Sequence, residues 1–267
     1  MDFEDETEIL RTAYSIISFE EQVLSLEADG KVKIPVYLGL GQEFIASTFA
    51  RFFRNQSPGI FAQHRAHSYY LAFGGDRDAL MAEILGDEVN GCAKGYGGSV
   101  GIYSKKANMF GHTGLMGEQA YLGVGWTLAN NQRSLIVIGD ATVEEDYVSP
   151  ALGFAATHSL PCIFICEDNG LAILTPTTKR RSWKATDLAE SFGIKSYDIS
   201  DSPDEIISIL SNANLDYPLF LNINTQRKNR HVGARLEGNI TIDRLKIFEN
   251  DYVKKYGIKK LENLRSI

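Results

Sequence analysis

The stretch from Ser134 to Asn169 restricts the possible folds of this chain more than any other. It contains two short apolar runs rich in β-branched or bulky residues, Ser134 to Ile138 and Cys162 to Cys166. Such runs are typical of strands that are buried on both faces of a sheet. Between them, apolar and small side chains recur at helical spacing over residues 144 to 158. Because a helix joins the two strands, they should be parallel, with their carboxyl ends on one edge of the sheet.

The first strong oxygen donors after these two strands are Asp140 and Asn169. They should lie close together at the edge where ligands of open α/β sheets bind. A carboxylate and an amide carbonyl are hard oxygen ligands that suit Mg²⁺, which keeps positions free for phosphate. The helix expected after Asp140 points its N-terminus at the same place, so the predicted ligand is Mg²⁺ carrying a diphosphate. The alternative is that Asp140 caps that helix and Asn169 fills a turn.

The composition excludes several classes of protein. The 267 residues are 44% hydrophobic and 23% charged, which fits one large α/β domain spanning residues 1–267. The chain has no apolar run of the roughly 18 residues that a membrane helix needs, and its acidic start argues against a signal or transit peptide. A net charge of −7 argues against nucleic acid as a partner. Three cysteines without zinc or disulfide spacing indicate a reducing cytoplasm.

Helices and strands alternate along the chain, which predicts a parallel sheet with helices on both faces. Further helices are expected over residues 3–28, 41–53, 76–86, 118–131, 186–192, 203–213 and 241–264, and further strands over 194–199 and 218–224. Ser202 should cap the helix that begins at Pro203. Residues 225–238 contain several arginines and few apolar residues, which predicts a mobile basic loop.

Several motifs resemble those of one enzyme family. The triplet Gly139-Asp140-Ala141, followed by Asn169 after the next strand, resembles the motif that binds thiamine diphosphate. Other stretches resemble the alpha subunit of thiamine diphosphate-dependent 2-oxo acid dehydrogenases, which include the pyruvate and acetoin dehydrogenases. These stretches are GQE at 41–43, QHRAH at 63–67, GCAKGYGGS at 91–99 and GHTGLMG at 111–117. The resemblance runs from about Tyr14 to His231 and implies the thiamine diphosphate-binding fold.

The resemblance also implies which residues hold the cofactor. The metal ligands would be Asp140, Asn169 and the backbone carbonyl of Leu171, and the cofactor contacts would be His64, Arg65, Gly114, Met116, Asp140, Ala141, Thr142, Asn169, Leu171 and His231. The guanidinium fork of Arg65 suits phosphate oxygens. Ala141 replaces the usual glycine, which is harmless if its φ is negative.

Histidines carry a less specific signal than the motifs around them. His231 matches an essential histidine on a loop that reaches over the cofactor, so the resemblance implies a catalytic role. The alternative for His231 is an ordinary solvent-exposed side chain. For His64 and His67 taken alone, the alternative is a basic cluster on the surface. Tyr37 stands where family members often have a substrate-contacting histidine, and this difference leaves the substrate open.

In this family a glutamate of a separate beta subunit activates the cofactor ring. The resemblance therefore implies an α2β2 heterotetramer that acts on a 2-oxo acid or an acyloin. A lipoyl acyltransferase is a further partner if the enzyme is a 2-oxo acid dehydrogenase. The alternatives are a subunit of another thiamine diphosphate enzyme, such as a split transketolase or a biosynthetic ligase, and a non-catalytic scaffold. The metal pair and Arg65 argue against the scaffold.

Overall fold

The computed structural model describes residues 1–229, 231–232 and 243–265. Its main feature is a sheet of six parallel strands in the order β2-β1-β3-β4-β8-β7. The strands are β1 Gly59–Gln63, β2 Met109–Thr113, β3 Ser134–Gly139, β4 Cys162–Asp168, β7 Lys195–Ser200 and β8 Leu219–Asn224. A separate antiparallel hairpin contains β5 Leu171–Ala172 and β6 Thr175–Pro176. The parallel α/β sheet predicted from the sequence is confirmed.

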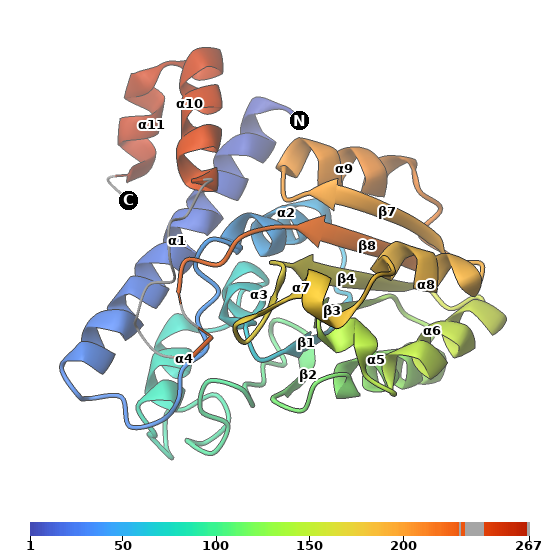
Figure 1. Ribbon diagram of the computed structural model, residues 1–267. Helices are drawn as coiled ribbons and strands as arrows, with labels where there is room; N and C mark the ends of the chain where they lie inside the picture. Colours follow the sequence, from blue (N-terminus) through green and yellow to red (C-terminus); the bar gives the residue numbers. More distant parts are fainter. Residues whose placement is uncertain (230, 233–242, 266–267) are drawn as a thin grey trace.

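Helices cover both faces of the sheet, as predicted (Figure 1). The helices are α1 Phe3–Ala28, α2 Glu43–Phe52, α3 His67–Ala72, α4 Arg77–Ile84, α5 Glu118–Asn130, α6 Val148–Thr157, α7 Thr177–Arg180, α8 Ala185–Ser191, α9 Pro203–Asn212, α10 Arg244–Tyr256 and α11 Ile258–Arg265. Within the described ranges, no helix combines the length and the apolar character that crossing a membrane requires.

The two faces of the sheet build two separate cores because successive side chains of a strand point to opposite sides. In β3, Leu135 and Val137 pack with α1 to α4 and α9, whereas Ile136 and Ile138 pack with α5, α6 and α8. Cys162 and Cys166 of β4 are fully buried in the second core, as expected. A strand with two buried faces needs apolar residues at every position, which explains the continuous apolar runs.

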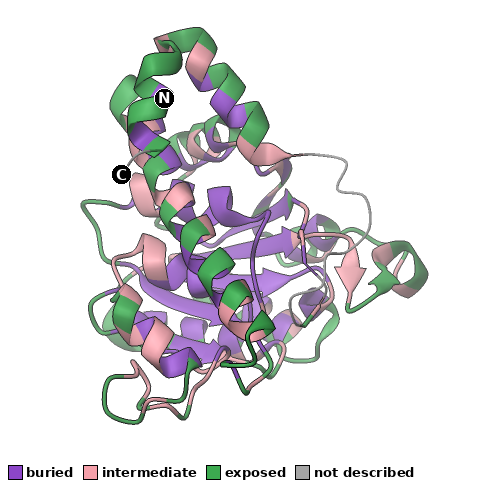
Figure 2. Cartoon of the chain, turned by 90° about the vertical axis from the view of Figure 1, so that its left-hand side faces the viewer, coloured by how far each residue is buried: buried purple, intermediate pink, exposed green. Residues whose placement is uncertain are grey.

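A third apolar cluster joins the two ends of the chain. Helices α10 and α11 pack against α1 through residues that include Ile9, Leu10, Tyr252 and Leu261. Figure 2 shows the exposed outer sides of the helices around the buried sheet. The sequence predicted one helix over 241–264, but Gly257 has a φ of +88° and separates α10 from α11.

Three other expectations were wrong or incomplete. No α-helix begins directly after Asp140: a 3₁₀ turn, η1 (Thr142–Glu144), comes first, Glu145 is extended, and α6 begins at Val148. The helix N-terminus expected directly after Asp140, at the predicted anion site, is therefore absent. The Ser202 side chain makes no capping hydrogen bond to α9. Strands β1 and β2 were missed, because they are short and contain glycine and polar residues.

The strand order reverses between β1 and β3. The chain passes from β1 to β2 on one side of β1, and later forms β3 on its other side. In open parallel sheets, ligands bind outside the carboxyl ends of the two strands at such a reversal. The segments that follow these strands begin with His64-Arg65 and Asp140-Ala141-Thr142. The topology therefore selects the same edge as the sequence motifs.

One buried carboxylate holds the glycine-rich loop. Glu83 of α4 is fully buried and accepts hydrogen bonds from four backbone N–H groups. The donors are Ala93 (2.6 Å), Gly95 (2.9 Å), Gly97 (2.7 Å) and Gly98 (3.0 Å). These amides take no part in a helix or strand, so the Glu83 side chain replaces the partners that regular structure would supply.

Replacing Glu83 with alanine should lower the free energy of unfolding by at least about 3 kcal/mol, because hydrogen bonds to a charged group each contribute roughly 1.5–3 kcal/mol. Urea unfolding followed by circular dichroism measures this change. Glu88→Ala, at an exposed position of the following turn, is the control and should cost less than about 0.5 kcal/mol. Equal stability of the two variants would contradict the role of Glu83.

A second buried acid predicts a pH dependence of stability. Glu43 at the start of α2 is buried, and its Oε2 accepts a hydrogen bond from Gly41 N–H at 2.6 Å. Burial raises the pKa of Glu43 from 4.5 to about 7. Between these two values the folded chain keeps a proton that the unfolded chain has lost, so stability falls as the pH rises.

Glu43→Gln keeps an oxygen acceptor for Gly41 but cannot ionise. From pH 5 to pH 8, wild type should lose roughly 2–3 kcal/mol of stability relative to this variant. Urea unfolding at both pH values gives the difference. Glu21→Gln, on the exposed side of α1, should follow wild type at both pH values, and parallel behaviour of Glu43→Gln and wild type would refute the prediction.

Candidate active site at the carboxyl edge of the sheet

The predicted site residues follow different strands but emerge along one edge. Because the six strands are parallel, their carboxyl ends lie on the same side of the sheet. His64 and Arg65 follow β1, Gly114 and Met116 follow β2, Asp140, Ala141 and Thr142 follow β3, Asn169 and Leu171 follow β4, and His231 lies beyond β8. The sequence placed Asp140 and Asn169 at one edge of the sheet, and the other predicted site residues follow strands that end at the same edge.

Thr142 connects the strand ends on either side of the reversal. Its hydroxyl donates to Oε1 of Gln63, the last residue of β1, at 2.9 Å. The same oxygen lies 3.6 Å from the sulfur of Met116, which belongs to the loop after β2. Ala141 has a φ of −79°, the negative value that its replacement of glycine requires. The segment after β3 is thus fixed to both neighbouring loops.

Arg65 is buried and links two distant segments of the chain. Its Nη1 donates to the Leu38 carbonyl at 2.9 Å, and its Nη2 donates to the His231 carbonyl at 2.8 Å. The same Nη2 lies 3.1 Å from Nδ1 of the His231 ring. A guanidinium can only donate, so Nδ1 is the acceptor and the ring carries its proton on Nε2.

Three aromatic rings meet beside this arginine. The ring centroids of Tyr37 and His64 are 5.0 Å apart, and His231 lies 5.4 Å from each. Burial, aided by the Arg65 charge, lowers the pKa of His64 to about 2, so its ring is neutral. His64 and His67 are both buried, which excludes the surface basic cluster considered from the sequence. Neither ring nitrogen of His64 has a hydrogen-bond partner among the described residues.

A chain of buried polar groups holds the backbone of Tyr37 and Gly39. The N–H of Tyr37 donates to Ser99 Oγ, and the N–H of Gly39 donates to Glu20 Oε1, both at 3.0 Å. His67 lies between these acceptors, with Nε2 3.0 Å from Ser99 Oγ and Nδ1 3.4 Å from Glu20 Oε1. This clamp was not predicted from the sequence, although His67 of the QHRAH motif was a signal for it.

The two predicted metal ligands occupy neighbouring strand ends. Gly139 pairs with Glu167 in the parallel register of β3 and β4, and Asp140 and Asn169 follow these strands. Asn169 Oδ1 accepts from Leu171 N–H at 3.3 Å, as expected for an asparagine in a turn. The described residues contain no group of three or more His, Cys, Asp and Glu side chains arranged to hold a metal ion. A metal here would depend on Asp140 with amide and carbonyl oxygens, which are the donors that Mg²⁺ accepts.

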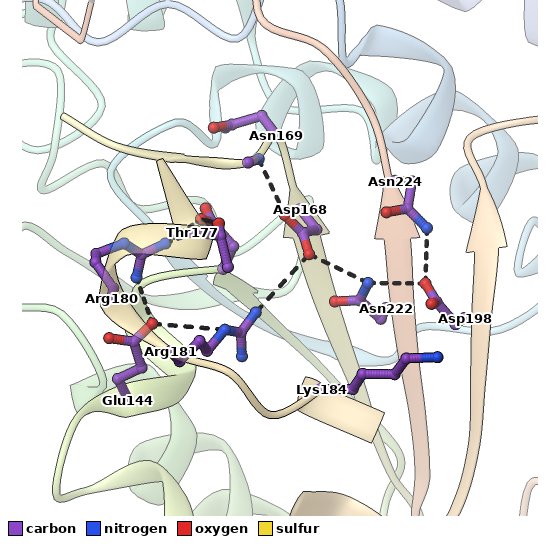
Figure 3. Close-up of polar contacts among 12 residues, drawn as sticks. Glu144, Asp168, Asn169, Thr177, Arg180, Arg181, Lys184, Asp198, Asn222 and Asn224 are labelled. Atoms are coloured by element: carbon purple, nitrogen blue, oxygen red, sulfur yellow. Dashed lines mark hydrogen bonds and ion pairs between the residues drawn. The ribbon is translucent and has the colours of Figure 1, made fainter. Parts of the chain in front are cut away.

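Asp140 already has two partners from α7, the Thr177 and Arg180 side chains that are labelled in Figure 3. Its Oδ2 accepts a hydrogen bond from Thr177 Oγ1 at 2.8 Å and one from Arg180 Nη2. Arg180 also pairs with Glu144 of η1 through Nη1. Thr177 and Arg180 were not predicted as site residues, although the sequence shows the basic run KRR at 179–181 shortly after Asn169.

Polar contacts continue from α7 across the ends of the next strands (Figure 3). Arg181 Nη2 lies 3.8 Å from Asp168 Oδ2, and its guanidinium stacks over the Trp183 ring at 4.8 Å. Asp168 accepts from Asn222 Nδ2 at 3.3 Å. Burial, together with the neighbouring Asp140 carboxylate, raises the pKa of Asp168. The edge therefore carries a line of acids, each beside an arginine or an amide.

The basic segment 225–238 is only partly described, since residues 230 and 233–238 lie outside the described residues. Its mobility therefore stays a prediction. The described part is not a solvated loop: Arg227 is 6% exposed, and Lys228 N–H donates to the Leu40 carbonyl at 2.7 Å. These contacts bring the segment back over the start of α2.

Comparisons with known proteins agree with the resemblance seen in the motifs. The model of the family described as "Dehydrogenase E1 component" matches residues 13–204. Pyruvate dehydrogenase E1 component subunit alpha of Zymomonas mobilis is 31% identical over 199 residues, which are 72% of this chain and 56% of that protein. The Rickettsia bellii protein of the same name is 26% identical over 273 residues, with 91% and 82% covered.

Solved structures support the fold. Transketolase from Campylobacter jejuni has a TM-score of 0.62 at 16% identity and covers 84% of this chain and 38% of its own. A transketolase variant from Pichia stipitis has a TM-score of 0.59 at 14% identity, with 98% and 47% covered. The chain spans 56% of the Zymomonas mobilis protein and 58% of its Rhizobium meliloti counterpart, little more than half of either. Because the family model matches most of its length, the chain belongs to the dehydrogenase E1 component family.

Proposed function

We propose that this chain is the alpha-type subunit of a thiamine diphosphate- and Mg²⁺-dependent enzyme that acts on 2-oxo acids with a separate beta subunit. The observation that carries the proposal is the position of Arg65 and Asp140. Arg65 follows β1 and Asp140 follows β3, the two strands on either side of the reversal in strand order. In open parallel sheets, ligands bind at this position. A cation and a carboxylate there match a diphosphate and its metal ion.

The residues around Arg65 fit a diphosphate. His64 is neutral and buried, and its unpartnered ring offers one N–H donor without adding charge. Thr142 is fixed by Gln63, so the N–H groups of Ala141 and Thr142 belong to a positioned segment. Gly114 and Met116 would line the aminopyrimidine ring with backbone atoms, as the motif match implies.

The residues around Asp140 fit a magnesium ion. Asp140 supplies the charge, the Asn169 amide supplies a neutral oxygen, and Leu171 would contribute its backbone carbonyl, which does not depend on the side chain. Asn169 is oriented by Gln42, whose Oε1 accepts from Asn169 Nδ2 at 3.3 Å. A magnesium ion held by these three oxygens would keep its other coordination positions free for phosphate.

The chemistry would be divided between the cofactor and the chain. Bound thiamine diphosphate supplies the carbanion chemistry, and the protein supplies binding, orientation and proton transfer. His231 is the candidate for proton transfer, because Arg65 engages Nδ1 and leaves the proton on Nε2, from which it can be donated to an oxyanion. The Tyr37 ring packs against both the His64 and the His231 rings beside this nitrogen's imidazole.

The glutamate that activates the cofactor ring would come from another chain, the beta subunit. Glu43 is buried against the Gly41 N–H, and Glu118 accepts from the Thr113 hydroxyl at 3.1 Å. Both carboxylates are engaged within their own loops. We infer a separate beta subunit, an α2β2 assembly and a cytoplasmic location, with a lipoyl acyltransferase as the next partner if the acceptor is lipoyl.

Tyr37 favours a second candidate function. Its ring packs against both His64 and His231, at a position where relatives often have a substrate-contacting histidine. A changed side chain there fits a different substrate, such as an acyloin or the donor of a biosynthetic carboligation. The two functions differ in their products, because carboligation forms a carbon–carbon bond without reducing an acceptor.

The function is tested by co-expressing the chain with a beta-type subunit of the same family and screening 2-oxo acids with an artificial electron acceptor. The chain alone should show no decarboxylation. In the complex, Asp140→Ala should abolish Mg²⁺-dependent thiamine diphosphate binding measured by calorimetry, and Asn169→Ala should weaken it less, because it removes a neutral ligand. Asp146→Ala, an exposed acid nearby, is the control. Undiminished binding by Asp140→Ala would refute the site.

The contacts between Arg65 and His231 predict opposite kinetic effects. His231→Ala should lower kcat by roughly 10²-fold with nearly unchanged cofactor affinity, because a positioned acid–base group acts in the transition state. Arg65→Ala should weaken cofactor binding first, since a diphosphate contact also acts in the ground state. Steady-state kinetics at saturating cofactor separate the two. His158→Ala, at the exposed end of α6, should behave as wild type, and full turnover by His231→Ala would remove it from the mechanism.

A further inference from the structure

The segment after Asn169 turns back over the strand ends. Residues 171–181, here called the strap, comprise the β5–β6 hairpin and α7. Thr177 N–H donates to the Gly170 carbonyl at 2.9 Å and closes the hairpin at its base. Helix α7 therefore lies beside the carboxyl ends of β3 and β4 (Figures 1 and 3).

The strap occupies one oxygen of the proposed metal ligand. Asp140 Oδ2 accepts from both Thr177 Oγ1 and Arg180 Nη2. Both charged side chains are shielded from solvent, with 13% of the Arg180 side chain and 4% of the Asp140 side chain exposed. The pair is therefore shielded from solvent and is not a solvated surface contact.

Neighbouring charges hold α7 in this position. Glu144 pairs with Arg180 and lies 3.6 Å from Arg181 Nε. Arg181 in turn faces Asp168 and stacks on Trp183. Two arginines thus lie among three acids, and Arg180 keeps Glu144 as a partner if it leaves Asp140.

Arg180 and a metal ion cannot share Asp140 Oδ2. Mg²⁺ needs a free lone pair at about 2.0–2.1 Å in near-octahedral geometry, whereas two donors already engage this oxygen. The guanidinium also carries a positive charge, which repels a divalent cation at contact distance. Metal binding to this oxygen therefore requires α7 to release it.

We propose that Arg180 is an internal competitor for the metal site, and that the strap releases Asp140 when Mg²⁺ and thiamine diphosphate bind. The inference rests on the proposed role of Asp140 as a metal ligand. It assigns to Arg180 and Thr177 the control of metal affinity, which no motif in the sequence indicated. Removing the competitor should strengthen metal binding, an effect that a misfolded variant cannot imitate.

The test is calorimetric titration of Mg²⁺ into the assembled alpha–beta complex at saturating thiamine diphosphate. Arg180→Ala should lower the apparent Kd for Mg²⁺ by about tenfold, the low end expected for losing a hydrogen-bonded charge pair. Arg180→Gln keeps a donor for Asp140 without the charge and should give a smaller gain. Lys179→Ala removes the same charge from the adjacent exposed position of α7 and should leave the Kd within about twofold of wild type.

Trp183 offers a readout of strap movement that does not depend on activity. It is 40% exposed and stacks on Arg181 at the end of the strap. Adding Mg²⁺ to the wild-type complex with thiamine diphosphate should change the tryptophan emission, and Trp183→Phe should lose this change. Arg180→Ala should reach the same final emission at lower Mg²⁺ concentration. Emission that stays constant while calorimetry records binding would overturn strap release.

The variants separate this inference from the proposed function. If Asp140→Ala abolishes Mg²⁺ binding but Arg180→Ala leaves it unchanged or weaker, the competitor role is wrong and the function stands. Weaker thiamine diphosphate binding by Arg180→Ala would make Arg180 a phosphate contact instead. If Asp140→Ala binds as wild type does, the site assignment itself fails.

Discussion

Backbone that belongs to neither helix nor strand must still satisfy its N–H groups, and buried glutamates do this around the candidate site. Glu83 accepts from four amides of the glycine-rich loop, Glu20 from Gly39, and Glu43 from Gly41. Burying a carboxylate is costly unless donors surround it. Each of these acids lies where an irregular segment turns toward the strand ends. Its hydrogen bonds hold that segment, and with it the candidate site, in place.

The same principle applies to the side chains between the loops. Glu167, fully enclosed at the end of β4, accepts from Gln42 Nε2 and from the Tyr69 hydroxyl. Burial raises its pKa to about 8. The Gln42 side chain also accepts a hydrogen bond from Asn169. The buried Glu167 carboxylate therefore positions Asn169, a proposed metal ligand, through Gln42. Position 41, next to Gln42, requires a glycine, because a Cβ there would lie 2.3 Å from the Gln226 carbonyl oxygen.

Arginines at this edge have two different environments. Arg65 donates to the backbone carbonyls of Leu38 and His231, which are neutral acceptors. Arg180 and Arg181 face carboxylates, and their charges are largely compensated. This contrast separates a side chain suited to binding diphosphate from side chains suited to holding a segment in place.

The amino-acid sequence by itself determined the sheet, its central strands and the edge at which the candidate site lies. These follow from local facts: continuous apolar runs at β3 and β4, a helical spacing between them, and Asp140 and Asn169 directly after the strands. Strands β1 and β2 escaped detection, because five residues with glycine and polar ends carry little periodicity. Only the tertiary structure decided that α7 returns to Asp140, that His64 is buried and neutral, and that Glu20, His67 and Ser99 clamp Tyr37. These contacts join residues far apart in the chain, and loops that pack by their own side chains leave no periodic signal from which such contacts could be read.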